Sequence, residues 1–321
     1  MTRYVAGRIV ESLIVIAVMS FAVYGLMALM PGDPIDIMVQ SDPNLTPADA
    51  ARLKALYGLD KPILERYGNW LGAAAVGDFG YSRIHNRPVL EVLAPRLVNT
   101  LILMGLALVL SLAIAVPVGL YSALKPYSAA DYAINFAALG GISVPVFWLA
   151  LMLIILFSVE LGWLPAGGMA SLNSEPGLAG LWDRARYLIL PLITLSVASI
   201  GGLTRYVRAA MMEVMRHDYI RTARAKGAPA RRVVWRHALR NAMIPVVTIL
   251  ALSFGTLFSG ALITETMFSY LGMGKLIYDS IIGNDYNVAL ISLLFATTVV
   301  LLSNLAADLC YAWLDPRVNL R

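Results

Sequence analysis

The histidines, the single cysteine and the hydroxyl side chains decide which chemistry this chain could perform. His85 lies far from His217 and His237 in the sequence, and no two histidines have the i, i+4 spacing that places metal ligands on one helix face. Cys310 is the only cysteine, so there is neither a thiolate cluster nor an internal disulfide. We therefore expect no metal site. We also expect no catalytic residues, because no nucleophile is paired with a base, and a membrane-embedded hydrolase would need such a pair.

A glycine-rich run has part of the pattern of a phosphate-binding loop. Gly272-Met273-Gly274-Lys275 contains the closing Gly-Lys pair, but Leu276 stands where Ser or Thr would hold Mg²⁺. Ser269 occupies the position of the first glycine of that motif. The sequence thus predicts that this chain binds neither ATP nor another cofactor.

The ionisable residues near the apolar stretches lie at the ends of those stretches: Glu11, Glu160, Glu265 and Asp308. Transporters driven by protons or ions keep such groups in the middle of the membrane, so we do not expect transport powered by this chain alone. Hydroxyl and proline residues remain as candidates for a translocation path: Ser143, Pro145, Ser199, Ser253, Thr256 and Ser259. Each is individually more typical of helix packing, but together they suit a path that passes a polar solute without holding it.

Membrane helices are the elements that must position these residues. The 321 residues are 59% hydrophobic and only 14% charged, with a mean hydropathy of +0.72, which excludes an ordinary soluble domain. A helix that spans a bilayer needs roughly 17–25 apolar residues. Six stretches meet this requirement, namely 9–30, 97–124, 132–159, 187–204, 242–264 and 288–307. We predict an all-α, polytopic membrane protein with six transmembrane helices, of which the second and third can bend at Pro117 and Pro145.

The distribution of Lys and Arg predicts the orientation. These residues concentrate near the two termini and in the segment 205–241, and positively charged loops stay on the cytoplasmic side. We therefore expect 1–30 to hold a cytoplasmic N-terminus and the first helix, and 316–321 to be a cytoplasmic C-terminus.

The segment 31–96 then lies outside the membrane, between the first two helices. Thr46, Pro47 and Asp49 have the pattern of a capping box at a helix start, and a second helix is expected over about 62–75. We predict a small helical outer domain. The sequence leaves open whether it is a lid on the helix bundle or a docking surface for a partner.

The segment 205–241 differs from an ordinary positive loop. It holds ten Lys and Arg residues interleaved with alanines, and the residues from Asp218 onward predict a short helix that ends near Gly227, with Pro229 just beyond. A signal for membrane orientation needs positive charge but no alternating alanines closed by a glycine. We therefore interpret this helix as a surface for close contact with a partner that carries carboxylates.

Ordered motifs along the whole chain resemble one family. They are Pro31-Gly32-Asp33-Pro34, Tyr57-Gly58-Leu59-Asp60-Lys61-Pro62, Gly77-Asp78-Phe79-Gly80, 143–148, Gly162-Trp163-Leu164-Pro165, the run 218–227 with its continuation 236–245, Glu265-Thr266-Met267-Phe268 and Leu314-Asp315-Pro316-Arg317. On these residues the chain is identified as a member of the permease subunits of dipeptide, oligopeptide and nickel ABC importers.

This resemblance implies the type I ABC importer permease fold, with a core over 97–315, in a bacterial plasma (inner) membrane. It implies four kinds of partner: a homologous second permease, two cytoplasmic ATPases that bind ATP and Mg²⁺, an external solute-binding protein and the lipid bilayer, but no nucleic acid. By resemblance, the helix that couples to the ATPase comprises Tyr219, Arg221, Thr222, Ala223, Arg224, Ala225, Lys226 and Gly227. Arg221 and Thr222 depart from the general Glu-Ala-Ala form of that motif, as in the peptide and nickel subfamily.

The substrate and one other class of function stay open at this point. Peptides are the expected solute, and a nickel chelate, a glutathione or a glycan conjugate are alternatives. A membrane receptor or anchor that never transports a solute is the alternative from another class.

Overall fold

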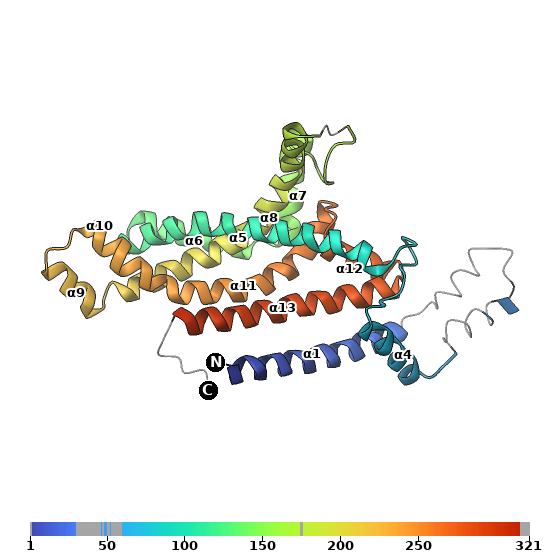
Figure 1. Cartoon of the computed structure of the whole chain (residues 1–321). Coiled ribbons are helices and arrows are strands. Elements are labelled where there is room, and N and C mark those ends of the chain that lie inside the picture. Colours follow the sequence, from blue (N-terminus) through green and yellow to red (C-terminus); the bar gives the residue numbers. More distant parts are fainter. Residues whose placement is uncertain are drawn as a thin grey trace. The chain divides into compact units, whose positions relative to one another are not determined.

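The computed structural model describes residues 2–29, 46, 48, 49, 52, 60–173 and 176–314, and these residues are mainly helical (Figure 1). The side chains of residues 2, 3, 28, 248, 251–260, 307 and 310–314 are excepted. In this part of the chain the strand-like pairing is a single antiparallel bridge between Tyr81 and Pro88. The predicted all-α class is confirmed. The helices are α1 (Thr2–Ala28), α4 (Ile63–Ala75), α5 (Val89–Leu124), α6 (Ala129–Ser143), α7 (Val146–Leu153), the π-helix η1 (Ile154–Glu160), α8 (Leu178–Val214), α9 (Asp218–Ala225), α10 (Ala230–Arg232), the π-helix η2 (Val233–Leu239), α11 (Arg240–Met267), α12 (Met273–Ile282) and α13 (Tyr286–Leu314).

Each predicted membrane stretch lies largely within helical structure. Over the described residues, four helices are long and apolar enough to cross a bilayer: Tyr4–Met27, Val89–Leu124, Leu178–Val214 and Tyr286–Ala306. The predicted stretch 187–204 is much shorter than α8. Charged residues flank the apolar middle of this helix, and the helix continues through them. The stretch 242–264 lies within α11, which continues through Pro245. The count of six spans stays a prediction.

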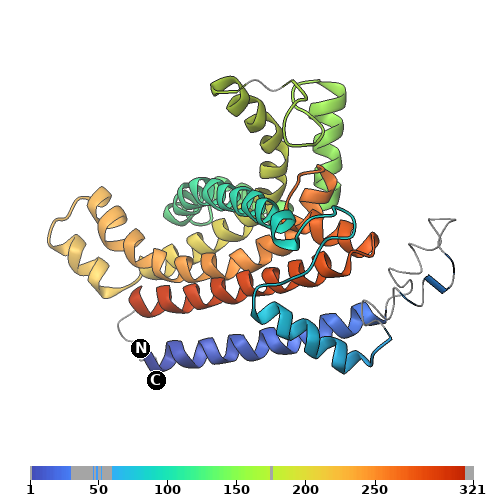
Figure 2. The same cartoon turned by 45° about the vertical axis from the view of Figure 1, so that its right-hand side comes forward.

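The stretch 132–159 is broken into two helical segments. α6 ends at Ser143 and α7 begins at Val146, and the two segments are bent by 99°, so that α7 leaves the direction of α6 in Figures 1 and 2. Pro145 causes the break, because proline has no N–H to donate and forces the preceding Val144 into an extended conformation. The bend predicted at Pro145 is confirmed, whereas α5 continues through Pro117 as one helix.

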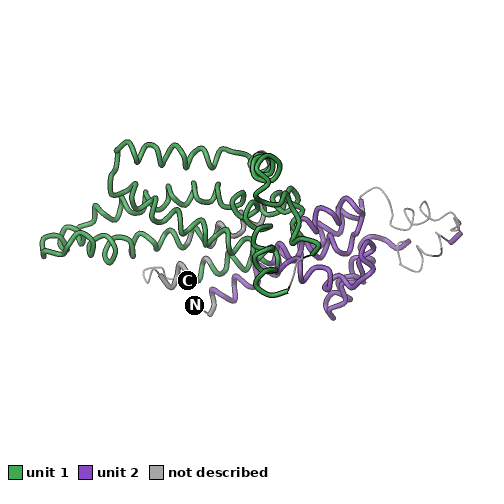
Figure 3. The backbone as a smooth tube through the Cα atoms, turned by 90° about the horizontal axis from the view of Figure 1, so that it is seen from above, with its two compact units in different colours: residues 1, 99–274, 299–321 green, residues 2–98, 275–298 purple. Residues whose placement is uncertain are grey.

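The described helices group into two compact units, coloured separately in Figure 3. Unit 1 comprises Met1, Asn99–Gly274 and Val299–Arg321, and unit 2 comprises Thr2–Val98 and Lys275–Thr298. In unit 1, α8 packs on both α6 and α11. Glycines make the approach of α8 close: a Cβ atom at Gly201 would lie 2.4 Å from the carbonyl oxygen of Ala138, and one at Gly119 would lie 2.7 Å from that of Thr204.

Unit 2 contains α4 and the loop that follows it. α4 confirms the helix expected over 62–75, and it packs on α1, where the Tyr67 hydroxyl and Ser20 Oγ are 2.8 Å apart. The loop is fixed by polar contacts, since Asp285 accepts hydrogen bonds from Ser82 Oγ and from the backbone N–H of Ile84. The separate outer domain over 31–96 stays a prediction.

The capping box predicted at Thr46 is present. The Thr46 N–H donates to Asp49 Oδ2 at 3.0 Å, and the Asp49 N–H donates to Thr46 Oγ1 at 3.3 Å. Hydrogen bonds from the Thr46 side chain and backbone lower the pKa of the Asp49 carboxyl. Most of the helix predicted to follow this box lies outside the described residues.

Candidate functional site

The short helix α9 begins and ends where its sequence predicts. Asp218 in the first turn and Arg224 in the last turn oppose the partial charges at the two helix ends. The helix closes in a Schellman motif, in which the Gly227 N–H donates to Arg224 O at 2.9 Å and the Ala228 N–H donates to Ala223 O at 3.2 Å. Gly227 has a φ of 75°, which glycine adopts without strain. The predicted stop near Gly227 is confirmed, and the motif explains why a glycine stands there.

One face of α9 is anchored in an apolar cluster. Ile220 is fully buried there, and Ala223 and Ala228 pack against the cluster from the helix end. We call this group the α9 cluster; its buried members are Leu120, Ala123, Val207, Met211, Val214, Ile220, Val233, Ala238, Ala242 and Val246. They belong to α5, α8, α9, η2 and α11. The helix is therefore fixed to the ends of three long helices and to η2.

The other face of α9 is open to solvent. Of the eight residues predicted to contact a partner, seven are exposed: Tyr219, Arg221, Thr222, Arg224, Ala225, Lys226 and Gly227. Ala223 is the exception, since it is half-buried on the α9 cluster. The exposed face combines three cations with small side chains that leave the backbone accessible. Such a surface can bind carboxylates of a partner that approaches closely.

Tyr219 forms the edge of the exposed face. Its ring stacks on that of His217, with centroids 5.5 Å apart and planes 15° from parallel. Partial burial raises the pKa of the Tyr219 phenol, and a hydrogen bond with the Asn241 side chain lowers it in part. The phenol is therefore neutral near pH 7 and contributes an apolar ring and a polar tip.

A hollow of about 480 Å³ lies where α8 leads into α9. It is lined by Arg208, Ala209, Met212, Glu213, Arg216 and His217. Its lining combines charged side chains with apolar surface, next to the start of α9.

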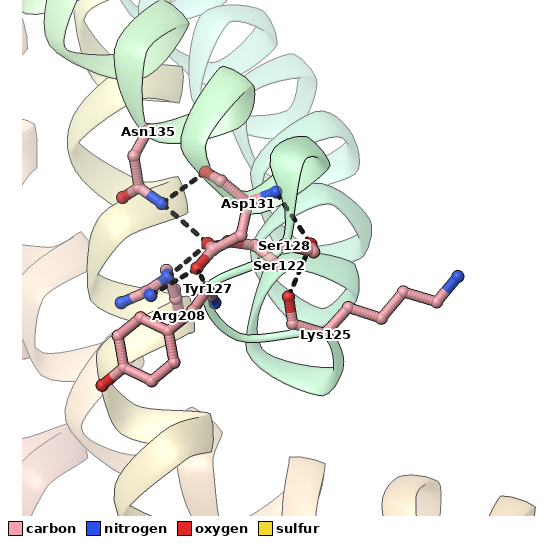
Figure 4. Close-up of polar contacts among 7 residues, drawn as sticks. All are labelled: Ser122, Lys125, Tyr127, Ser128, Asp131, Asn135 and Arg208. Carbon is pink, nitrogen blue, oxygen red and sulfur yellow. Dashed lines mark hydrogen bonds and ion pairs between the residues drawn. The ribbon is translucent and has the colours of Figure 1, made fainter.

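A buried ion pair lies beside the α9 cluster (Figure 4). The Asp131 side chain is only 2% exposed, and Arg208 of α8 binds it with two hydrogen bonds, from Nε to Oδ1 at 2.7 Å and from Nη2 to Oδ2 at 2.6 Å. The carboxylate also accepts hydrogen bonds from Ser122 Oγ, from the Tyr127 N–H at 2.9 Å and from Asn135 Nδ2 at 2.8 Å. Asp131 is thus paired and fully hydrogen-bonded, as a buried charge requires.

The sequence does not predict this pair, because Asp131 and Arg208 are 77 positions apart. One local signal was present: Ser128 caps α6 by accepting a hydrogen bond from the Asp131 N–H at 3.2 Å, and Ser-x-x-Asp is a pattern of helix starts. That pattern predicts the helix start but not its partner on α8.

Three of the residues predicted to line a path have described side chains. Ser143 is exposed at the end of α6 and donates to Leu139 O at 2.9 Å, Pro145 is exposed at the break before α7, and Ser199 is half-buried on α8. The side chains of Ser253, Thr256 and Ser259 on α11 lie outside the described residues. The path stays a prediction.

The glycine-rich run Gly272-Met273-Gly274-Lys275, at the start of α12, has a packing role. A Cβ atom at Gly272 would lie 2.2 Å from the Glu265 carboxyl group, and one at Gly274 would lie 2.4 Å from Leu262 Cα. Lys275 pairs with Asp279 one turn later, at 2.9 Å. Gly274 therefore lets the backbone of α11 approach closely, and Gly272 leaves room for the Glu265 side chain.

Two family descriptions match the chain. The family described as "Binding-protein-dependent transport system inner membrane component" matches residues 115–320, and the N-terminal component of the same kind of system matches residues 1–104. Together they cover nearly all of the sequence, and the first match contains α9 and the residues that anchor it.

Curated relatives match over their full length. The oligopeptide transport system permease protein AppB of Bacillus subtilis (strain 168) is 40% identical over 320 residues, which is 99% of this chain and 100% of the relative. The dipeptide transport system permease protein DppB of Escherichia coli (strain K12) is 37% identical over 331 residues, covering 98% of this chain and 96% of the relative.

The fold also matches a solved structure. A chain of the MetNI methionine ABC transporter in an inward-facing conformation is similar with a TM-score of 0.57 and 19% identity, covering 70% of this chain and 97% of that one. At this identity the likeness is one of fold alone.

Proposed function

Because the chain belongs to the family of binding-protein-dependent transport system inner membrane components, we propose that it is a permease subunit of an ATP-driven importer of peptides. The observation that carries the substrate class is full-length similarity to relatives named as oligopeptide and dipeptide permeases. The chain forms half of the path for a solute that an external binding protein delivers.

The other subunits supply what this chain lacks. A homologous permease completes the path, and two cytoplasmic ATPases bind ATP and Mg²⁺, so this chain is not an enzyme. Its termini and α9 lie on the cytoplasmic side of a bacterial inner membrane. The partner of α9 is an ATPase surface that carries carboxylates. The three cations on the exposed face of α9 support this proposal.

Coupling follows from how α9 is held. Closure of the ATPase dimer displaces α9, and the buried Ile220 passes the displacement to the α9 cluster. Since this cluster joins the ends of α5, α8 and α11, these helices move together between inward- and outward-facing states. The two states differ in their contacts at the ATPases and at the external binding protein, which is what couples hydrolysis to transport.

Affinity purification from native membranes tests this function. The tagged chain, solubilised in mild detergent, is expected to recover a homologous permease, two ATPase subunits and vanadate-sensitive ATP hydrolysis. The ligand of the recovered binding protein then identifies the solute, and a nickel chelate, a glutathione or a glycan conjugate there would contradict the peptide class. Recovery of the chain alone, under conditions that keep other membrane complexes intact, would favour a receptor or anchor.

A further inference from the structure

The helix α6 is absent from the α9 cluster. The cluster and the partly buried residues around it come from α5, α8, α9, η2, α11 and the connections between them, and none comes from α6. α6 nevertheless packs extensively on α8 and leads into the break at Pro145. A displacement of α9 therefore reaches α6 only through its contacts with neighbouring helices, above all α8.

We propose that the Asp131–Arg208 pair is a joint between these two helices, which makes α6 move with α8 when α9 is displaced. The inference rests on the proposed function, since it assigns two positioning residues to the coupling of transport with ATP hydrolysis. Arg208 follows Val207, a buried member of the α9 cluster, and reaches from there to the first turn of α6. Through Arg208, the pair is therefore directly adjacent in sequence to the α9 cluster on α8.

The joint is rigid because one carboxylate is held from four parts of the chain. Its donors are Ser122 of α5, the Tyr127 N–H of the turn before α6, Asn135 of α6 and Arg208 of α8, as Figure 4 shows. The two hydrogen bonds from the guanidinium fix both distance and orientation, which a single contact would not. Removing one partner leaves a buried charge unpaired, so the pair resists separation.

The contacts farther along α6 transmit the movement but do not replace the joint. Ala138 faces Gly201, and Gly141 faces Val197, through close backbone approaches without hydrogen bonds between side chains. Such contacts allow one helix to slide on the other, as in shear motions of packed helices. The charged pair at the first turn of α6 prevents that sliding.

A purely structural role makes a different prediction from a coupling role. If the pair served stability alone, its loss would lower the amount of assembled complex, while each assembled complex would still transport the same amount of solute per ATP. The decisive quantity is therefore the ratio of solute transported to ATP hydrolysed, measured on intact complex in proteoliposomes with the binding protein and a peptide ligand.

The variants are Arg208→Gln and Asp131→Asn, with Arg208→Lys as the conservative change and Arg205→Gln as the control. Arg205 lies one turn earlier on α8 and is exposed. We expect Arg208→Gln and Asp131→Asn to lower the transport-to-ATP ratio about tenfold, as loss of a typical coupling free energy would. Each assembled complex still hydrolyses ATP, Arg208→Lys keeps part of the ratio, and Arg205→Gln leaves it unchanged.

The proposed joint is contradicted if the transport-to-ATP ratio is unchanged in Arg208→Gln and Asp131→Asn. It is also contradicted if Arg205→Gln lowers this ratio equally. Should the first two variants fail to assemble, Arg208→Lys decides, because it keeps the charge and loses the paired geometry; a wild-type ratio there overturns the proposal. If the wild-type chain recovers no ATPase, the proposed function itself is contradicted. If the wild type and Arg208→Gln both transport solute with the same transport-to-ATP ratio, only the joint is contradicted.

Discussion

At the scale of single residues, Gly227 shows how a local conformation determines a surface. Its φ of 75° lets the chain turn back after α9, so that Ala228 returns to the α9 cluster while the cations of α9 stay exposed. No atom lies within 4 Å of a Cβ atom built there, so any cost of substitution is conformational and not steric.

Replacing Gly227 with valine is expected to cost about 1–2 kcal/mol, because a β-branched residue is strained at this φ. The strain shifts the end of α9 and lowers both ATPase recovery in affinity purification and ATP-driven uptake. Gly227→Asn is the matched control, since asparagine tolerates this region of backbone conformation better. A valine variant that assembles and transports like wild type would show that α9 does not need this turn.

At the scale of elements, the packing of α8 on α6 depends on one glycine of an adjacent pair. A Cβ atom at Gly201 would lie 2.4 Å from the Ala138 carbonyl oxygen, whereas one at Gly202 would meet nothing within 4 Å. The two positions therefore differ in packing but share the same helix and the same residue type.

We expect Gly201→Ala to destabilise the fold by about 1–3 kcal/mol, because the backbones of α6 and α8 must separate. Gly202→Ala is expected to be neutral or to stabilise by up to about 1 kcal/mol, because alanine favours helix. Thermal unfolding of the two purified variants in detergent checks this. Equal unfolding midpoints would contradict the close approach of the two helices.

How much of these elements the sequence predicts depends on how local the signals are. α9 and its end at Gly227 follow from residues within one short segment, and the resemblance stated from the ordered motifs is confirmed by full-length relatives. Pro145 marks where the stretch 132–159 breaks, but a proline alone does not specify the 99° angle between the two segments. The partner of Asp131 could not be predicted, because a contact between positions far apart leaves no periodic signal in one sequence.

At the scale of the whole molecule, the orientation proposed for α8 can be measured. Leu172, before α8, is fully exposed, and Ala230, at the start of α10, is exposed outside the residues predicted to contact the ATPase. In a Cys310→Ala background, a maleimide that cannot cross membranes is expected to label Leu172→Cys in intact spheroplasts. It should label Ala230→Cys only after permeabilisation. Labelling of Ala230→Cys from outside would contradict the proposed topology.

The central claim is that the exposed face of α9 contacts an ATPase, and a photocrosslink from that face tests it most directly. A photoreactive amino acid at Arg224 in native membranes, activated by light, is expected to form a covalent adduct with a subunit that binds ATP. The same amino acid at Leu172 is expected to form no such adduct. If Arg224 gives no ATPase adduct while the chain remains assembled and transport persists, the account of α9 as the coupling helix is contradicted.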